Sequence, residues 1–335
     1  MASTEEPRVS VITPVYNGEK HIATTIQSVL AQRYTNWEYI IVNNCCADRT
    51  VEIAQQWAQK DSRIRIVHND ALLDVVRSFN RAFSVAPLES EYIKIVAADD
   101  WLFPNCLSEM VALAEAHPNV GMVTSYVLSG TRVGFDGQPF EDMPFAGTVV
   151  NGRGACRMRL LNNLFVFGGP SASLLRTSVV KQYDPFYTIG NYHGDNDAYL
   201  RLLQKYDFGY VHQVLTYRRR GEDSRTTHML NSMNSHILNI VEELVTFGPV
   251  FLTPEELQPR LKKATDDYYE FLAHQAFEFR GRKFWDTHFE RLNKLGTPFD
   301  KGKFTRFAFL RLVDMLFNPK RSLQGAMRRL FRRAH

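Results

Sequence analysis

The sequence predicts an α/β fold in which a mostly parallel sheet is flanked by helices. In the first hundred residues, short β-branched and apolar runs alternate with segments whose apolar residues repeat at helical spacing. Repeated strand–helix–strand units imply parallel strands joined by right-handed crossovers. The 44% apolar and 23% charged residues of this 335-residue chain are typical of a globular protein, not of a disordered or collagen-like one.

Four strands are predicted before residue 100, with helices between them. The strands are the apolar runs 9–13, 39–42, 64–67 and 92–96. Helical spacing predicts helices over 18–32, after Asp48, which takes the N-cap position, and over 72–85. In such a sheet ligands bind beyond the carboxyl ends of the strands, so we expect the functional site in the four loops that follow.

The rest of the chain is predicted to be mixed and then helical. Strands are expected at 120–127, 171–175 and 208–211, with helices over 153–163 and 197–206. Beyond Thr227 the pattern changes to long helices over 229–246 and 254–279, followed by basic segments after 300. We therefore predict two domains, with 1–228 carrying the sheet and 229–335 forming a helical C-terminal region.

The formal net charge of +4 is unevenly distributed. Residues 301–335 contain ten basic residues and one acidic residue, Asp314, so this segment carries +9 and the first 300 residues carry −5. A nucleic-acid-binding protein has its basic patch on the folded domain. Nucleic acid is therefore not expected as a partner.

The cysteines and the apolar runs indicate a cytoplasmic protein. Cys45, Cys46, Cys106 and Cys156 lack zinc-finger spacing, and so few cysteines suit a reducing cytosol. The first residues have no apolar core of a secretory signal, and no run of the sequence approaches the roughly 20 apolar residues of a membrane span.

The four loops after the predicted strands are polar or acidic. They read Pro14–Asn17, Asn43–Asp48, His68–Asp70 and Ala97–Asp100. The sequence has neither a P-loop nor a complete G-x-G-x-x-G motif, so a phosphate is not held by a glycine-rich turn. A ligand must instead be held by side chains, by ring stacking and by a metal at the acidic pair.

Four segments in this order resemble the family 2 glycosyltransferases, enzymes of the GT-A fold. They are Val9–Gly18, the loop ending in Ala47–Thr50, Ala98–Leu102, and Asp195 ahead of Tyr199–Arg201. The resemblance covers residues 8–220. It implies transfer of a sugar, with inversion, from a nucleotide-diphosphate sugar to a hydroxyl of a glycan or lipid-linked acceptor, in the synthesis of a cell-surface polysaccharide or glycolipid.

The resemblance also implies which residues bind the nucleotide sugar. They are Thr13, Pro14, Tyr16, Asn17, Glu19, Asn44, Arg77, Asp99 and Asp100. The ring of Tyr16 can stack on a base and the Arg77 guanidinium can pair with a diphosphate, while a plain turn and a surface arginine are the alternatives. Many relatives have an acidic pair where this chain has Asn43 and Asn44, which keep an acceptor for the base but remove the charge.

Asp99 is the metal ligand that the resemblance implies, with Asp100 as its neighbour. The family's Asp-x-Asp motif would span 97–99, and Ala97 lacks the first carboxylate. Mg²⁺ or Mn²⁺ takes oxygen ligands and stabilises the charge that develops on a departing diphosphate. A solvated acidic turn that caps the next helix is the alternative.

Asp195 is the expected general base, because an acceptor hydroxyl must lose its proton during attack. The family has Glu before this Asp, where this chain has Gly194. Asp197 is the second candidate for the base, and helix capping is the alternative role for Asp195.

Two basic segments carry separate expectations. The segment 218–228 could fold over the diphosphate as a lid, and His228 could complete a metal shell. In 322–333, apolar residues along one helical face alternate with arginines, a pattern suited to an anionic membrane surface. We therefore expect 301–335 to place the enzyme on the inner face of a membrane, with packing of this helix on the core as the alternative. The apolar residues that support lipid contact are Leu323, Met327, Leu330 and Phe331, with Phe304, Phe307, Leu310 and Phe317 before them.

Two other functions stay open. A non-catalytic nucleotide-sugar-binding or scaffold protein of the same fold would tolerate the changes at Ala97 and Gly194. A nucleotidyltransferase also uses an α/β sheet and carboxylate-bound metal, but it would normally have a glycine-rich, basic loop where this chain has Pro14–Gly18.

Overall fold

The computed structural model describes residues 6–130, 132–134, 148–164, 166–191, 193–219, 235–278 and 280–318. The chain forms two compact units, Met1–Met229 and Leu230–His335. The lid residues 220–228, including His228, and the amphipathic segment 322–333 lie outside the described residues.

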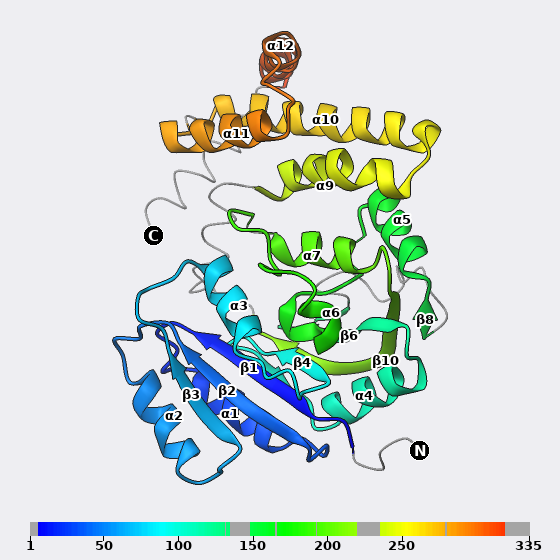
Figure 1. The fold of residues 1–335 in the computed structure, drawn as a ribbon. Coiled ribbons are helices and arrows are strands. Elements are labelled where there is room, and N and C mark those ends of the chain that lie inside the picture. The colour runs from blue at the N-terminus through cyan, green and yellow to red at the C-terminus, as the bar shows by residue number, and fades with distance from the viewer. Residues whose placement is uncertain are drawn as a thin grey trace. The chain divides into compact units, whose positions relative to one another are not determined.

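The first unit is built on one sheet of ten strands with helices packed against it (Figure 1). The strand order is β3-β2-β1-β4-β9-β6-β10-β5, with β7 beside β6 and β8 beside β10. The strands are β1 (Val9–Val15), β2 (Trp37–Asn43), β3 (Ile64–His68), β4 (Tyr92–Ile95), β5 (Trp101–Leu102), β6 (Val120–Ser129), β7 (Arg132–Gly134), β8 (Val149–Val150), β9 (Leu174–Arg176) and β10 (Asp207–Arg218). The helices are α1 (Ile22–Leu30), α2 (Thr50–Ala58), α3 (Val75–Ser84), α4 (Cys106–Ala116), α5 (Gly152–Asn162), α6 (Thr177–Val180) and α7 (Gly194–Leu202).

The first half of the sheet confirms the predicted parallel strands. β1 pairs in parallel with β2 and with β4, and β2 pairs in parallel with β3. Every residue of β2 is buried, as expected for a continuous apolar run covered on both faces. Helices α1, α2 and α3 connect these strands, each close to its predicted position.

The second half of the sheet is mixed. β9 pairs antiparallel with both β4 and β6, and β6 then pairs in parallel with β10. The predicted strand over 171–175 is wrong in its first part, because Pro170–Ala172 forms a 3-10 helix and β9 begins only at Leu174. The helix expected after the acidic pair is α4, for which no range was predicted. Its residues Leu107, Met110, Val111 and Ala114 have helical spacing and are buried.

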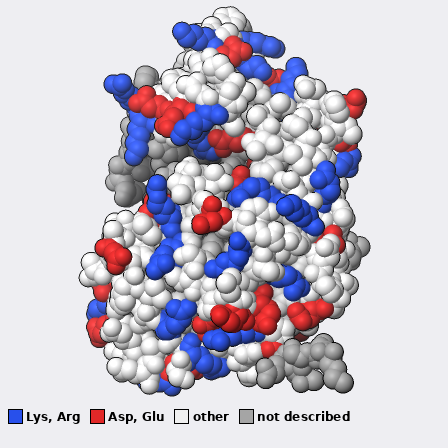
Figure 2. Space-filling model, in the orientation of Figure 1, with Lys and Arg blue, Asp and Glu red and all other residues white. Residues whose placement is uncertain are grey.

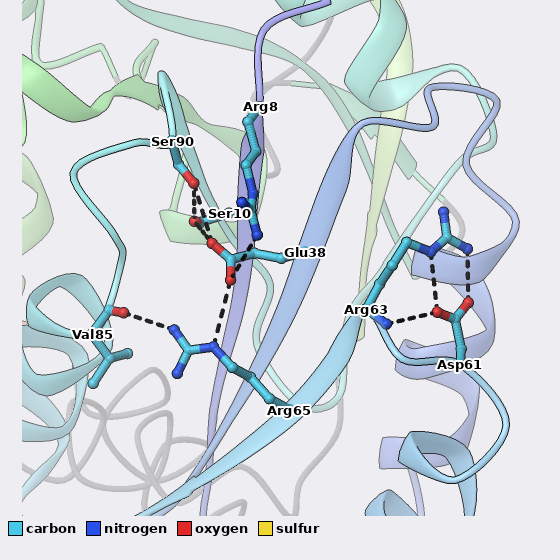
Figure 3. A network of polar contacts seen from close by, with 8 residues as sticks. All are labelled: Arg8, Ser10, Glu38, Asp61, Arg63, Arg65, Val85 and Ser90. Atoms are coloured by element: carbon cyan, nitrogen blue, oxygen red, sulfur yellow. Dashed lines mark hydrogen bonds and ion pairs between the residues drawn. The ribbon is translucent and has the colours of Figure 1, made fainter.

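A polar network lies at the amino ends of β1 and β2, opposite the predicted site (Figure 3). Buried Glu38 accepts a hydrogen bond from Ser10 (2.7 Å), and Ser90 lies within hydrogen-bond distance of both. Arg8 and Arg65 each approach the other carboxylate oxygen of Glu38 at 3.5 Å. This edge of the sheet is therefore closed by ion pairs and hydroxyl groups.

The second unit is helical. It contains α9 (Ser235–Phe251), α10 (Pro254–Ala276), α11 (Arg282–Lys294) and α12 (Lys301–Phe317). α10 begins in a capping box in which Thr253 and Glu256 each accept a backbone hydrogen bond from the other. Among the described helices, none combines the length and apolarity needed to cross a bilayer.

Candidate functional site

The loops that follow the parallel strands meet at one edge of the sheet. Val15 of β1 lies beside Asn43 of β2, which lies beside His68 of β3. Thr25 of α1 donates its hydroxyl toward the carbonyl oxygens of Ala98 (3.0 Å) and Asp100 (2.9 Å) in the loop after β4. The predicted loops thus lie at the same edge, as expected from the parallel order.

Asn17 and Glu19, after β1, hold this loop to the loop after β2. Asn17 adopts a φ of 50°, and its Oδ1 accepts a hydrogen bond from the Ala47 amide (2.8 Å). Glu19 Oε2 accepts from the Arg49 amide (3.1 Å). Both side chains, expected at the nucleotide, therefore shape the loop that would receive it.

Asp48 stabilises the same junction. Its carboxylate accepts hydrogen bonds from the amide (3.1 Å) and hydroxyl (2.5 Å) of Thr50 and from the amide of Glu19 (3.0 Å). Desolvation raises the pKa of Asp48, but these hydrogen bonds outweigh it and hold the pKa below its usual value. Asp48 therefore stays ionised beside the first turn of α2, where a negative charge is favoured.

Asn44 holds the segment before α3 against the end of β2. Its Oδ1 accepts from the Leu73 amide (2.9 Å) and from Asn69 Nδ2 (3.0 Å), and its Nδ2 donates to the Leu73 carbonyl (2.9 Å). Only 4% of Asn44 is exposed. An amide is needed here because a carboxylate would have no donor for the Leu73 carbonyl. In this structure Asn44 builds the wall of the site instead of presenting its amide to solvent.

The remaining residues of the first loop differ in exposure. Thr13 is fully buried and its hydroxyl lies 2.9 Å from the Tyr39 hydroxyl, so its side chain belongs to the core. Pro14 and Tyr16 are partly exposed at the edge. Of this loop, these two offer side-chain surface that a base could contact.

Asp99 and Asp100 lie between β4 and β5 and differ in burial. The Asp99 side chain is 35% exposed, whereas Asp100 is 6% exposed. Arg219, directly after β10, brings its Nε within 3.7 Å of Asp99 Oδ2 and donates its backbone N–H to Asp100 Oδ1 (3.0 Å). The first residue of the predicted lid segment beyond β10 thus joins the acidic pair.

The two carboxylates of the pair oppose each other electrostatically. Desolvation, followed by the charge of Asp99, raises the pKa of Asp100 to about 6, and hydrogen bonds from Ser171 and Arg219 only partly offset this. A cation would relieve this repulsion, and oxygen donors suit Mg²⁺ or Mn²⁺. Within the described ranges no cluster of three or more His, Cys, Asp or Glu residues could hold a metal by itself. Among the described residues, a cation at Asp99 would therefore have phosphate or water oxygens as its further ligands.

Ser171 links the acidic loop to the strands beneath it. Its hydroxyl oxygen accepts from the Ala97 amide (3.0 Å), and its carbonyl accepts from Lys94 Nζ (2.8 Å) and the Thr216 hydroxyl (3.1 Å). Lys94 is fully buried, which lowers its pKa. Ser171 is the part of the site that the sequence did not indicate, because it was assigned to a strand and only the tertiary fold brings it to the acidic loop.

A ring pair fixes the strand that follows the acidic pair. Trp101 of β5 stacks on Tyr217 of β10 with ring centroids 3.6 Å apart and an interplanar angle of 7°. The two residues are also partners in the antiparallel β5–β10 ladder. This pair holds the acidic loop and the end of β10 in register.

Asp195 lies in the first turn of α7. Helix α7 directly precedes β10 in the chain. The Asp195 carboxylate is partly exposed, and its Oδ1 accepts from the Asn196 amide (2.9 Å). A partly exposed carboxylate is accessible to an acceptor hydroxyl, as a general base must be.

Asp197 is held by neighbouring donors. Its Oδ2 accepts from Arg201 Nε (3.0 Å) and the Thr188 hydroxyl (2.7 Å). Both bonds hold the Asp197 carboxylate against residues of the first unit. Asp195 and Asp197 therefore lie in the same first turn of α7, and the choice between them as base stays a prediction.

Arg77 lies in the first turn of α3. It forms an ion pair with Asp74, the N-cap residue of this helix, and about half of its side chain is exposed. The preceding segment is the one that Asn44 holds, so Arg77 lies near the loop edge. A diphosphate would have to compete with Asp74 for this guanidinium.

The family model for glycosyl transferase family 2 matches residues 10–184, just over half of the chain. The chain belongs to glycosyl transferase family 2. EpsE of Bacillus subtilis (strain 168), described as a candidate glycosyltransferase, is 31% identical over 220 residues, which are 65% of this chain and 74% of EpsE. TuaG of the same organism, described as a candidate glycosyltransferase of teichuronic acid biosynthesis, is 38% identical over 95 residues, or 28% of this chain and 37% of TuaG.

Solved structures confirm the GT-A glycosyltransferase fold. S. aureus TarS 1–349 in complex with UDP-GlcNAc has a TM-score of 0.63 and 17% identity, covering 86% of this chain and 80% of that chain. The mannosyltransferase PcManGT of Pyrobaculum calidifontis, in complex with GDP-Man and Mn²⁺, has a TM-score of 0.55 and 15% identity, with 96% and 84% covered. At this identity the likeness concerns the fold alone.

This family 2 glycosyltransferase departs from the family pattern at two positions with structural neighbours. A Cβ atom at Gly194 would lie 3.1 Å from the Tyr187 Cβ, so Tyr187 crowds the position where the family has Glu. At Ala97 the backbone amide is bonded to Ser171.

Proposed function

We propose that this glycosyltransferase moves a sugar, with inversion, from a nucleotide-diphosphate sugar to a hydroxyl of a glycan or lipid-linked acceptor. The observation that carries the proposal is the joining of Asp99, Asp100 and Arg219 at the carboxyl edge of the sheet. The names of the structural neighbours support the donor class, since TarS is described with UDP-GlcNAc and PcManGT with GDP-Man.

The edge loops would hold the donor. Tyr16 and Pro14 have exposed surface for a nucleoside base, and Asn17 and Glu19 fix the loop that carries them. Arg77 has the charge for the diphosphate. Asp99 would hold Mg²⁺ or Mn²⁺, and the bound cation supplies charge stabilisation for the diphosphate leaving group.

Asp195 would act as the general base. Its carboxylate takes the proton of the acceptor hydroxyl as the oxygen bonds to the anomeric carbon. The bond from that carbon to the diphosphate breaks in the same step, and its electron pair leaves with the diphosphate. Attack from the side opposite the leaving group inverts the configuration, so one base suffices.

The comparisons also support a place in polysaccharide synthesis, because TuaG is described in teichuronic acid biosynthesis. We place the enzyme on the cytoplasmic side of a membrane, where a lipid-linked acceptor would be presented. The ten basic residues within 301–335 support this location.

The proposal is tested by transfer and binding assays on one pair of variants. With Mn²⁺ and a panel of UDP- and GDP-sugars, the true donor should raise the melting temperature, since a ligand stabilises the native state by mass action. Asp195→Asn should lower transfer by roughly 100-fold or more and keep this thermal shift. Asp197→Asn is the matched control. It should lower stability, because it removes the ion pair with Arg201, and it should affect turnover less.

The outcome separates the proposal from its main rival. Normal transfer by Asp195→Asn would refute the assignment of the base. A donor that stabilises the protein without transfer to any acceptor would support a non-catalytic nucleotide-sugar-binding protein, the function that the changes at Ala97 and Gly194 favour. The anomeric configuration of the product, measured by NMR, tests inversion.

A further inference from the structure

The last described helix, α12, carries large apolar side chains in contact with solvent. They range in exposure from 44% for Leu312 to 80% for Phe317. Isolated exposed apolar residues are normal on proteins, but a contiguous group of them marks an interaction surface. We call this group the outward face of α12; it consists of Phe309, Leu310, Leu312, Leu316 and Phe317.

The outward face is a single stripe. A helix turns by about 100° per residue, so these five positions fall within a sector of about 160°. Arg306 lies in the same sector, one turn before Phe309, whereas Arg311 and Asp314 lie outside it and pair with each other (2.8 Å). From Phe309 to Phe317 the sector therefore contains no charged side chain, and Arg306 marks its amino end.

The opposite side of α12 is anchored within the second unit. Lys303 Nζ pairs with Asp266 of α10 (2.9 Å), and the Phe304 ring lies 5.3 Å from Phe299 and 6.0 Å from Trp285. In Figure 1, α12 is seen nearly end-on beside α10 and α11. These contacts attach the first turn of α12 to the second unit, while no residue of α12 is buried.

We propose that the outward face of α12 inserts into the surface of an anionic lipid bilayer. This inference rests on the proposed membrane location. The sequence pattern pointed to 322–333 together with Phe304, Phe307, Leu310 and Phe317, and the structure assigns the apolar contact to the five exposed residues of α12. The charge of +9 over 301–335 favours anionic lipid, and it would repel a second copy of the same helix. Arg306, Arg311 and Asp314 interrupt the apolar sequence of α12, so the helix would lie along the bilayer surface.

Vesicle binding by the full chain tests the inference. Phosphatidylcholine vesicles that contain phosphatidylglycerol are mixed with the protein without donor or acceptor, and bound protein is measured by flotation. Phe317→Ser should weaken binding roughly tenfold, and the triple variant Phe309→Ser, Leu316→Ser, Phe317→Ser by at least about 100-fold. The matched control is Leu88→Ser, because Leu88 of the first unit is nearly as exposed, at 76%, and should leave binding unchanged.

Further measurements separate the possible occupants. The difference between the wild-type chain and the triple variant should persist at high salt, since apolar insertion is not screened. Equal binding by both proteins would overturn the inference. A second outcome would also overturn it: a wild-type chain that is dimeric and a triple variant that is monomeric, with equal vesicle binding by both. The outward face would then join two copies of the chain. The triple variant should transfer sugar to a water-soluble acceptor at the normal rate. If neither the wild-type chain nor the variants transfer sugar, this result would count against the proposed function and not against the membrane contact.

Discussion

The acidic pair shows how burial divides the roles of two neighbouring residues. Asp99 is accessible and near Arg219, whereas Asp100 is enclosed and bound to a backbone amide and Ser171. The accessible carboxylate is the one suited to a metal ion. The buried carboxylate of Asp100 is repelled by the charge of Asp99, and a bound cation would reduce this repulsion.

Asp100→Asn should change how stability depends on pH in the metal-free protein. The pKa of Asp100 is raised from 3.8 to about 6, so the native state holds this proton more tightly than the unfolded state. The group therefore favours folding below about pH 4, and this contribution is lost as the pH rises to about 6, by about 3 kcal/mol in total. The unfolding free energy is measured by urea denaturation as a function of pH, with a chelator present. The variant should lack the fall that the wild-type chain shows between about pH 4 and 6. Parallel curves for the two proteins would show that Asp100 is not perturbed.

At the scale of elements, the loops of the site are held by side chains that the sequence suggested for the ligand. Asn17, Glu19 and Asn44 each bond the backbone of a neighbouring loop. Such side-chain bonds fix loops that have no ladder of their own. The parallel strands bring the loops together, and these three residues set their shape.

Asn44→Asp should weaken the loop before α3, even though many relatives carry an acid there. The carboxylate keeps an acceptor for the Leu73 amide but faces the Leu73 carbonyl without a donor. The expected loss is about 1–3 kcal/mol of unfolding free energy. Chemical denaturation measures it, with Asn293→Asp on the exposed surface of α11 as the control. An Asp variant as stable as the wild-type chain would contradict this role for Asn44.

At the scale of the whole molecule, binding and stabilising groups lie at opposite edges of the sheet. The loops occupy the carboxyl edge, and the Glu38 network closes the amino edge (Figure 3). On the visible surface, acidic and basic side chains are interspersed and no broad face carries one sign (Figure 2).

Glu38→Ala should therefore lower stability without affecting the donor. It removes the acceptor of Ser10 and the shared partner of Arg8 and Arg65, at a cost of about 2 kcal/mol. The thermal shift caused by the donor should equal that of the wild-type chain. A reduced shift would mean that the two edges are coupled.

The sequence by itself determined the family, the alternating strands and helices, and the edge where the loops meet. Local apolar periodicity and the order of the motifs carry that information, because each strand and loop is read from consecutive residues. It also placed Asp99, Asp100 and Asp195 in loops or at a helix start, where the structure has them.

Only the tertiary structure decided which neighbours these residues have. Ser171 reaches the acidic loop from a segment 70 residues away, and Tyr187 crowds Gly194, through contacts that no sequence spacing records. Burial likewise removed Thr13 from the surface and left the outward face of α12 exposed. The burial of Thr13 and the exposure of the outward face both depend on which side of a strand or helix is covered by other segments. That side is determined by packing between residues distant in the sequence.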